Sequence, residues 1–464
     1  MKILLIQPSQ DRGLGFRSLG VVEPLGLETI AGSLPEQKVK ILDLRLENRL
    51  PRVLKDFQPD FCGINCSFTI DVYQTREITA AIKAWRRDVP VFVGGHHASL
   101  SPEDFYYPSI DGVAIGEGEA TTPELVRALE KGEDLRTIPG LALNEASGPY
   151  YTPERPLINN LDELPLAARH LTQGYRFHYH LGFQKPFSIM ETARGCPYRC
   201  DFCSVWKFFQ GKCRMKSPSR VLDEIKIIRE KFIFIADDNF LLSVPRAKRI
   251  AELIIENKVK KRFMFQARSD AIVQHPEVIP LLRKAGFWKV YIGFEKIDEE
   301  DLDRLNKHNS IQNNEEALKI LRAHGMDVIA SFIIDPSFQE NDFRRLRQYI
   351  LDRKLYSPSL TILTPLPGTE LFAKLKGKLI TTNYELFDYV HAVLPTKLKL
   401  PDFYREFTEL YKTGYAWSQI GWEGAAAIFR NAFSISHLIS MKRAAWASVE
   451  PRNYLAGHER KVVF

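Results

Sequence analysis

Short runs rich in β-branched and aromatic residues alternate with helical stretches along this chain, and this alternation constrains its fold more than any other feature. In the first 145 residues the predicted strands are KILLIQ (2–7), VKILDL (39–44), FCGINC (61–66), VPVFVGG (89–95) and DGVAIGEG (111–118). Helical stretches separate them, and parallel strands need such crossovers. We therefore expect a doubly wound, Rossmann-like parallel sheet, which binds ligands beyond the carboxyl ends of its strands.

The alternation resumes at residue 186 and continues to residue 370. Its predicted strands are FSIMETA (187–193), FIFIADD (232–238), RFMFQAR (262–268), KVYIGFE (289–295), DVIASFII (327–334) and SLTILTP (359–365). Six strand–helix units are two short of a closed eight-stranded barrel, so we expect an incomplete, open (β/α)6 barrel. The working residues of such a barrel lie at the carboxyl ends of its strands.

The remaining segments differ from both blocks. Residues 146–185 are rich in Pro, Tyr and Asn, which is typical of a linker. The pattern after residue 370 is mainly helical. The α/β chain is therefore expected to have four parts: a first domain over 1–145, a linker over 146–185, a barrel over 186–370 and a helical C-terminal region over 371–464.

Charge and hydropathy exclude several classes of protein. A formal charge of +7 over 464 residues is too mild for a dedicated nucleic-acid binder. No stretch approaches eighteen consecutive apolar residues, so we expect no transmembrane helix. The start MKILLIQPSQ has too short an apolar run for a signal peptide. We therefore expect a cytoplasmic protein whose thiols stay reduced, which disfavours a disulfide framework.

Four of the six cysteines stand in ARGCPYRCDFCSVWKFFQGKC (193–213). Cys196, Cys200 and Cys203 follow the spacing C-x3-C-x2-C directly after a predicted strand, and Cys213 stands ten residues further on. A cubane [4Fe–4S] cluster is normally held by four thiolates, so three in one tight loop leave one iron open for another ligand. The alternative is a zinc site with Cys213 as the fourth ligand, although zinc modules usually show two paired spacings.

The cysteines outside the triplet are expected to be structural. Cys62 and Cys66 lie in the strand pattern 61–66, which is typical of core residues. Cys213 is expected to be an ordinary buried thiol. The triplet alone is therefore predicted to hold a metal centre.

The C-x3-C-x2-C spacing is the signature of the radical S-adenosylmethionine (SAM) superfamily, which this chain resembles. The resemblance implies that Cys196, Cys200 and Cys203 hold a [4Fe–4S] cluster whose open iron is chelated by the amino and carboxylate groups of SAM. It also implies that an electron from the cluster cleaves SAM to a 5′-deoxyadenosyl radical, which takes hydrogen from an unactivated carbon.

Motifs at the following strand ends match the superfamily in order. ADDN (236–239) implies that Asp238, with Asp237 as second choice, receives the SAM ammonium group. By the same resemblance Arg268 in QAR meets the SAM carboxylate, and Glu295 in GFE accepts hydrogen bonds from the ribose hydroxyls. TPLPGTE (364–370) resembles the turn near the adenine. Taken singly, an acidic residue at a strand end is more often a helix cap or a solvated group.

An open sheet ahead of such a barrel, with PLGLETIAGSL early and GEGE at the fifth strand, resembles the cobalamin-binding class of this superfamily. The resemblance implies cobalamin contacts from Ser67, Gly94, Gly95, His96, Glu117 and Gly118. Taken alone, such glycines make tight strand-to-helix turns. None of the eleven histidines has Asp two places before it, so the motif D-x-H-x-x-G is absent and the lower cobalt ligand stays undetermined. His96 and His97 are expected to contact the corrin or its nucleotide tail.

Longer stretches narrow the resemblance to the hopanoid C-3 methylase group. They are IADDNFLL, GFEKIDEEDL, TPLPGTELF and above all LITTNYELFDYVHAVLPTKLKLPDFYREF (379–407), which lies outside the cofactor motifs. This resemblance implies methyl transfer from SAM, via methylcobalamin, to an unactivated sp3 carbon of a polycyclic lipid. It also implies an electron donor such as flavodoxin or ferredoxin.

Other functions remain open at this stage. An anaerobic tetrapyrrole enzyme of the same class, either a Mg-protoporphyrin ester oxidative cyclase or a chlorin side-chain methylase, would also need an apolar, aromatic cavity. A methylthiotransferase would carry an extra cysteine set in its first domain, and Cys62 with Cys66 falls one short of such a set. A sensor of light or oxygen would not need the SAM-facing residues Asp238, Arg268 and Glu295.

The C-terminal region combines aromatic and basic residues. Its marked aromatics are Trp417, Trp422, Phe429, Phe433 and Trp446. They are suited to wall a substrate cavity or to rest on a membrane surface, which would place the protein at the inner face of the membrane. The alternative is that they form the core of a helical cap.

Overall fold

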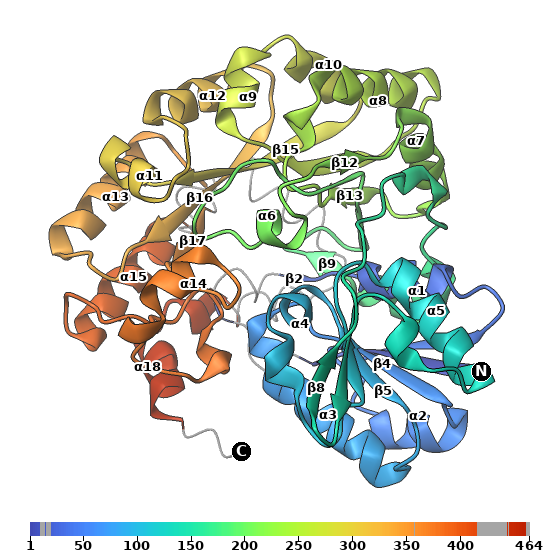
Figure 1. The fold of residues 1–464 in the computed structure, drawn as a ribbon. Coiled ribbons are helices and arrows are strands. Elements are labelled where there is room, and N and C mark those ends of the chain that lie inside the picture. The colour runs from blue at the N-terminus through green and yellow to red at the C-terminus, as the bar shows by residue number, and fades with distance from the viewer. Residues whose placement is uncertain (10–13, 15–19, 357, 415–442, 444, 461–464) are drawn as a thin grey trace.

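Two sheets organise the described part of the chain, and Figure 1 shows them as two bodies with the short helix α6 (Val205–Phe208) between them. The computed structural model describes residues 1–9, 14, 20–356, 358–414, 443 and 445–460. Residues that follow the parallel strands of both sheets converge at α6, since His96 of the first domain stacks on Phe208 of α6.

The first sheet has the order β3 (Lys38–Asp43), β1 (Lys2–Gln7), β4 (Phe61–Asn65), β5 (Val91–Gly94), β6 (Gly112–Ala114), β7 (Leu141–Glu145) and β8 (Gly148–Tyr151). Its strands from β3 to β6 are parallel. Ile3 and Leu5 of β1 belong to one core cluster and Leu4 and Ile6 to another, as alternation along a strand requires.

Helices cover both faces of this sheet. The cluster that contains Ile3 is completed by α1 (Leu25–Gly32) and α5 (Gly118–Lys131), and the cluster that contains Leu4 by α2 (Leu50–Phe57) and α3 (Val72–Trp85). The short helix α4 (His96–Leu100) follows β5 at the carboxyl edge. The predicted doubly wound sheet is therefore confirmed.

The first sheet continues past residue 145, where the sequence predicted the first domain to end, because β7 and β8 form an antiparallel hairpin that reaches Tyr151. Gly148 begins β8 with a φ of +123°, a backbone conformation that suits glycine in a tight turn. The rest of the predicted linker is tied to both domains. Arg169 pairs with Glu23 of the first domain and donates to the Ile189 carbonyl oxygen of the second at 2.7 Å.

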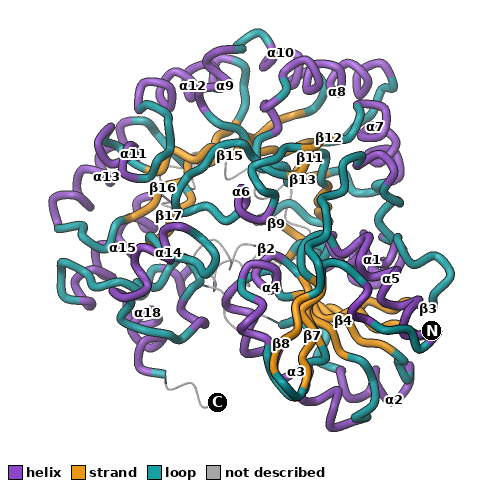
Figure 2. The backbone as a smooth tube through the Cα atoms, in the orientation of Figure 1, coloured by secondary structure: helices purple, strands orange, loops and turns teal. Residues whose placement is uncertain are grey.

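The second sheet consists of six parallel strands in chain order: β10 (Phe187–Met190), β13 (Phe232–Ile235), β14 (Arg262–Gln266), β15 (Phe287–Glu295), β16 (Asp327–Ile334) and β17 (Ser359–Ile362). All neighbouring pairs are parallel. The strands form an open arc in Figure 2, so the predicted incomplete barrel is confirmed.

Helices cover the outer side of this arc (Figure 1). They are α7 (Pro218–Ile227), α8 (Val244–Glu256), α9 (Ser269–Gln274), α10 (Val278–Lys284), α11 (Glu299–Arg304), α12 (Ile311–Ala323) and α13 (Glu340–Asp352). Phenylalanines make up much of the core beneath them. Phe263 and Phe287, for example, lie with ring centroids 4.9 Å apart.

The C-terminal region is helical where it is described, with α14 (Glu370–Leu375), α15 (Leu400–Gly414) and α18 (Pro451–Glu459). Tyr404 of α15 and Tyr454 of α18 are fully buried and stack at 5.1 Å. The aromatics Trp417, Trp422, Phe429 and Phe433 lie outside the described residues, whereas Trp446 is 59% exposed. Among the helices that the structure describes, none is long and apolar enough to span a bilayer.

Candidate active site between the two domains

The cysteine loop (residues 195–213) leaves the second sheet beyond β10 and is closed by a short antiparallel pair, β11 (Ala193–Arg194) and β12 (Arg214–Met215). Gly195 opens the loop with a φ of +89°. A Cβ at this position would lie 2.1 Å from the Lys212 carbonyl oxygen, so the approach of the two loop ends requires glycine.

Hydrogen bonds from distant segments hold the cysteine loop in place. The Gly195 N–H donates to Asp238 Oδ2 at 3.2 Å, which joins the loop to the end of β13. Asn306 Nδ2 donates to the Arg199 carbonyl oxygen at 2.8 Å, and the Leu371 N–H of α14 donates to the Asp201 carbonyl oxygen at 3.0 Å. These contacts fix the position of the loop relative to the barrel and to α14.

The three predicted cluster ligands lie on this loop at the carboxyl end of the barrel. Cys200 is buried, and Cys196 and Cys203 are partly exposed. Burial raises the pKa of all three thiols, that of Cys203 to about 12. The charge of Cys200 also raises the pKa of Cys196, and the charges of Cys200 and Cys196 raise that of Cys203, so the three thiols are near one another. Three clustered thiols fit a [4Fe–4S] cluster, because bound iron stabilises the thiolate form that burial disfavours.

This geometry does not choose between an iron–sulfur cluster and zinc. Within the described ranges, no three His, Cys, Asp or Glu side chains, the cysteine triplet included, are grouped tightly enough to hold one metal ion. Cys213 is partly exposed, so the prediction that it is buried is wrong. It lies where the loop returns to its start, and burial followed by the charge of Cys196 raises its pKa to about 11. Cys62 and Cys66 are fully buried, as predicted.

The two aspartates after β13 have different environments. Asp237 is buried and accepts hydrogen bonds from the Thr192 N–H, the Thr192 hydroxyl and the Ala193 N–H, at 2.6, 2.5 and 2.9 Å. Asp238 accepts one from Gly195, and its Oδ1 accepts none from another described residue. Burial raises the pKa of Asp237 to about 6 and that of Asp238 to about 7. Asp237 therefore joins the strand ends, and Asp238 keeps an oxygen for a cationic ligand.

Arg268 follows β14 and makes more protein contacts than the sequence suggested. It pairs with Asp270 at 2.8 Å and donates to the carbonyl oxygens of Lys307 and His308 at 3.0 and 2.7 Å. Its guanidinium also lies 3.8 Å from the ring centroid of Tyr198, between two of the cysteines in the loop. These contacts use most of its donors, so Arg268 supports the cysteine loop whether or not it also meets SAM.

Glu295 ends β15 in the left-handed region, with a φ of +62°. Its Oε1 accepts a hydrogen bond from Lys307 Nζ at 2.7 Å. Lys307 is buried, and Glu295 and Cys200 both raise its pKa against the opposing effect of burial. Sequence reasoning missed Lys307, because a lysine in a polar loop after a short helix carries no signal of burial.

Small residues line the carboxyl edge of the first sheet. Gly94 is partly exposed and ends β5, and Ser67 follows β4 with its hydroxyl bonded to Asn65 Oδ1 at 2.8 Å. Gly95 has a φ of +112°, and a Cβ there would lie 2.6 Å from the same Asn65 oxygen. Phe68 is 51% exposed beside them. An edge of small side chains with one exposed aromatic ring fits the approach of a flat macrocycle such as cobalamin.

Glu117 and Gly118, at the same edge, are both in contact with other parts of the protein. The buried Glu117 carboxylate accepts one hydrogen bond from Arg194 and one from Arg214, both at 2.7 Å, and a third from the Ile158 N–H. A Cβ on Gly118 would lie 3.0 Å from Ile30 Cδ1. Glu117 therefore joins the first domain to the cysteine loop, and cobalamin contact by either residue stays a prediction.

His96 of the first domain contacts the cysteine loop of the second. Its Nε2 lies 2.8 Å from Ser204 Oγ, and its ring stacks on Phe208 of α6 at 4.6 Å. Burial lowers the pKa of His96 to about 4, so the ring is neutral at pH 7. His97 faces away and is bonded to Thr69 and Asp104. Because Ser204 follows Cys203 directly, the carboxyl edges of both domains meet at this contact.

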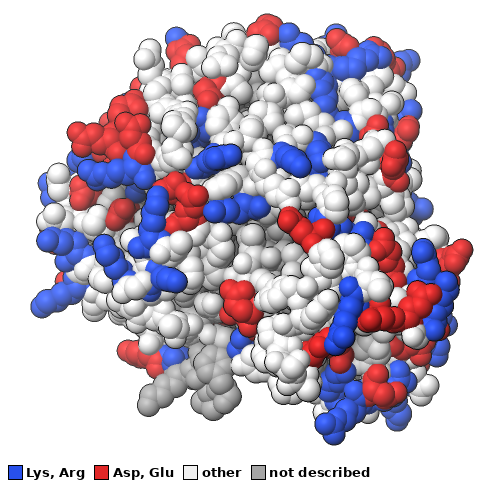
Figure 3. Space-filling view, in the orientation of Figure 1, with Lys and Arg blue, Asp and Glu red and all other residues white. Residues whose placement is uncertain are grey.

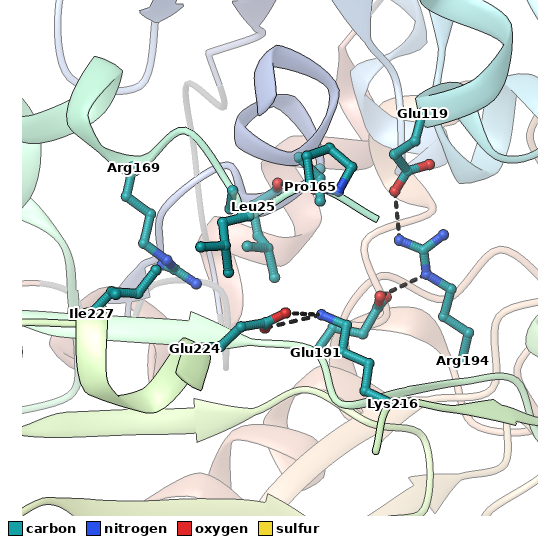
Figure 4. A pocket seen from close by; sticks show the side chains of 13 residues that line it. Leu25, Glu119, Pro165, Arg169, Glu191, Arg194, Lys216, Glu224 and Ile227 are labelled. Atoms are coloured by element: carbon teal, nitrogen blue, oxygen red, sulfur yellow. Dashed lines mark hydrogen bonds and ion pairs between the residues drawn. The ribbon is translucent and has the colours of Figure 1, made fainter. Parts of the chain in front are cut away.

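One cavity between the domains is too small for a large cofactor. Figure 4 shows this cavity of about 100 Å³, with Arg194 between Glu119 and Glu191. Arg194 pairs with these residues at 2.5 and 2.6 Å, and Lys216 pairs with Glu224 at 2.8 Å. Its charges are paired with one another, so the cavity belongs to the ionic contact between the domains.

Comparison with known proteins agrees with this geometry. Residues 190–350 match the Radical SAM superfamily, and residues 12–126 match the B12 binding domain family. The hopanoid C-3 methylase of Methylococcus capsulatus is 31% identical over 100% of this chain and 90% of its own length. The anaerobic magnesium-protoporphyrin IX monomethyl ester cyclase of Rubrivivax gelatinosus is 26% identical over 86% of this chain and 73% of its own length.

A solved structure shares the fold. It is that of a radical S-adenosylmethionine methyltransferase, TsrM, from Kitasatospora setae with cobalamin and a [4Fe–4S] cluster bound. It superposes with a TM-score of 0.69 at 16% identity and covers 96% of this chain and 99% of that one. This agreement supports the two-domain architecture with its helical C-terminal region.

Proposed function

This chain belongs to the cobalamin-binding radical SAM methyltransferases, and we propose that within this family it methylates C-3 of a hopanoid. Hopanoids are polycyclic lipids, and the target is an unactivated sp3 carbon. One observation carries the proposal: the similarity to the hopanoid C-3 methylase extends over the whole chain. It therefore includes residues 379–407, which lie outside the cofactor motifs.

The cluster, SAM and cobalamin supply the radical and methyl-transfer chemistry when bound, and the chain supplies placement. Cys196, Cys200 and Cys203 would hold the cluster. Asp238 has an unshared carboxylate oxygen beside the cysteine loop, where it would accept a hydrogen bond from the SAM ammonium group. Glu295 would orient the ribose, with Lys307 fixing its carboxylate from 2.7 Å.

The contact between the two carboxyl edges supports a shared reaction space. His96, Ser204 and Phe208 fix the distance between the sheet edge of Gly94 and the cysteine loop. Holding reacting groups in one orientation removes most of the entropic cost of bringing them together. The neutral His96 ring also adds no charge to a space that an apolar substrate would enter.

An apolar substrate from a bilayer suggests peripheral membrane contact as part of this proposal. The exposed indole of Trp446 is suited to the interfacial region of a membrane. Flotation of the purified protein with anionic liposomes tests this part separately. Protein that stays at the bottom of the gradient with and without liposomes would contradict it.

The proposed substrate is tested with S-adenosyl-[methyl-²H3]methionine. The reconstituted protein is incubated under reductant with a C-3 unsubstituted hopanoid or with magnesium-protoporphyrin IX monomethyl ester. We expect a trideuteromethyl hopanoid by mass spectrometry, no change in the porphyrin, and no product from the Cys200→Ala variant. Conversion of the porphyrin ester alone would contradict the proposal and favour the cyclase, to which a 26% identical relative belongs.

A further inference from the structure

The segment that follows α14, residues 376–399, connects the barrel with the first domain, and we call it the C-terminal strap. At the barrel, the Ile362 N–H of β17 donates to the Tyr389 carbonyl oxygen at 2.6 Å. At the first domain, the Tyr384 N–H donates to the Tyr73 hydroxyl of α3 at 3.1 Å, and the two rings stack. The strap therefore joins the last strand of the open barrel to the first domain.

One side of the C-terminal strap is apolar and buried. Leu386, Phe387 and Val393 form a core cluster with partly buried neighbours that include Leu379. The Ile380 N–H donates to the Val393 carbonyl oxygen at 3.0 Å, so the early and late parts of the strap lie side by side. The side chains that do not enter this cluster are left to form an outer surface.

This outer surface is basic. The strap contains four lysines and two acidic residues, Glu385 and Asp388. Asp388 is buried and pairs with His391, which leaves Glu385 as the one exposed acid of the strap. All four lysines are exposed, and none of them forms an ion pair with another residue that the structure describes. They are Lys376, Lys378, Lys397 and Lys399.

An apolar side chain is exposed among these cations. Ile380 is 49% exposed and stands two residues after Lys378. Figure 3 shows Lys and Arg side chains over the part of this face that α13, α14 and α15 form in Figure 1, with some acidic side chains among them. Lysines around an exposed aliphatic group suit an anionic bilayer, because the ammonium groups approach the headgroups while the apolar group enters the interface.

We infer that the C-terminal strap is the surface with which this protein rests on an anionic lipid bilayer. The inference rests on the proposed function only in that a hopanoid is itself a bilayer lipid. A bilayer fits better than a nucleic acid, because a net charge of +7 is mild for this length and because Ile380 offers apolar contact. A bilayer at the strap would deliver an apolar substrate beside the junction of the two domains.

The test compares two variants that each lose four exposed lysines. The strap variant carries Lys376→Gln, Lys378→Gln, Lys397→Gln and Lys399→Gln. The control variant carries substitutions on α2, α7, α10 and α12, namely Lys55→Gln, Lys226→Gln, Lys284→Gln and Lys319→Gln. Co-sedimentation measures binding to vesicles of phosphatidylglycerol with phosphatidylcholine, or of phosphatidylcholine alone, at low and high salt. Urea denaturation checks that both variants are folded.

Wild type is expected to bind the anionic vesicles, and the strap variant at least about 10-fold more weakly, because one lysine near an anionic leaflet strengthens binding about 5-fold. High salt should remove most of that difference, and the control variant should match wild type. Equal binding by wild type and the strap variant, an equal loss in the control variant, or wild-type binding that does not need phosphatidylglycerol would overturn the inference. So would wild type that binds a short RNA more tightly than anionic vesicles, which would assign the lysines to a nucleic acid.

A hopanoid in non-ionic detergent micelles tests the proposed function without a bilayer. Wild type that methylates the hopanoid in micelles, but binds vesicles no better than the strap variant, would contradict the strap inference alone. Lysine-dependent vesicle binding without any methylation of the hopanoid would contradict the proposed function alone.

Discussion

Replacing Glu117 with Gln removes the buried carboxylate that joins the two domains. Glu117 is 6% exposed and is bonded to Arg194, Arg214 and the Ile158 N–H. In the variant Arg194 keeps Glu119 and Glu191, but the Arg214 guanidinium keeps only the Ile158 carbonyl oxygen. One buried charge therefore loses its partner, which costs about 3–5 kcal/mol. We expect the free energy of unfolding of the cofactor-free protein to fall by about that amount.

Urea denaturation followed by circular dichroism and tryptophan fluorescence measures this loss. Burial raises the pKa of Glu117, but the Arg214 hydrogen bond and the Arg194 charge outweigh it, so the pKa lies below its usual range. The stabilisation that the Glu117 carboxylate provides is therefore complete above the ordinary pKa of glutamate, about 4.3. It is lost as the pH falls through the lower pKa that Glu117 has in the folded protein. The difference between wild type and variant should shrink below that pH.

The matched control is Glu145→Gln, which removes a carboxylate paired with Arg136 at the surface. It should change the urea midpoint little, because exposed ion pairs contribute little to stability. A loss below about 1 kcal/mol in Glu117→Gln, together with weaker cobalamin binding, would refute the structural role and favour the cofactor contact predicted from sequence.

Three further predictions concern the cofactor loops. Changing Cys196, Cys200 or Cys203 to Ala should abolish a stable cluster, whereas Cys213→Ala should keep about four irons per chain by iron analysis; loss of iron in Cys213→Ala would show that it is a ligand. Asp237→Asn should lower the free energy of unfolding by about 1–3 kcal/mol, because Asp237 is fully hydrogen-bonded to Thr192 and Ala193. Asp238→Asn should leave stability unchanged and weaken SAM binding in equilibrium dialysis. Weaker SAM binding in Asp237→Asn, together with lost stability in Asp238→Asn, would show that Asp237 contacts SAM and Asp238 supports the strand ends. Gly95→Ala should destabilise by about 1–3 kcal/mol, because its backbone is left-handed and a Cβ would collide with Asn65. Gly26→Ala in α1, where a Cβ meets nothing within 4 Å, is the control and should be neutral or stabilising.

The parallel sheets could be predicted because each strand is a local run of buried apolar residues. The range 327–334 was predicted for the strand that the structure places at Asp327–Ile334. The β7–β8 hairpin was missed because GPYY follows a turn in a segment rich in Pro and Asn, which reads as a linker. Exposed edge strands of this kind carry little hydrophobic signal.

The cysteine spacing predicted the cluster loop, but the partners of the other site residues are set by tertiary contacts. Arg194 and Arg214 bond to Glu117 although they lie far from it in the sequence, and Lys307 reaches Glu295 from a separate loop. Burial of Glu117 with its two arginines follows from how the two domains meet, whereas burial of Lys307 with Glu295 follows from packing within the barrel. A single sequence shows a charged residue at a strand end, and it does not show which partner neutralises that charge.

The central claim is that one chain brings an iron–sulfur cluster and cobalamin together at the contact between its domains. Counting iron and cobalt in the same anaerobically prepared sample, after cobalamin is offered, tests it most directly. The account predicts about four irons and one cobalt per chain, since a cubane cluster carries four irons. Four irons without cobalt would remove cobalamin from the reaction, and zinc in place of iron would contradict the assignment of the cysteine loop.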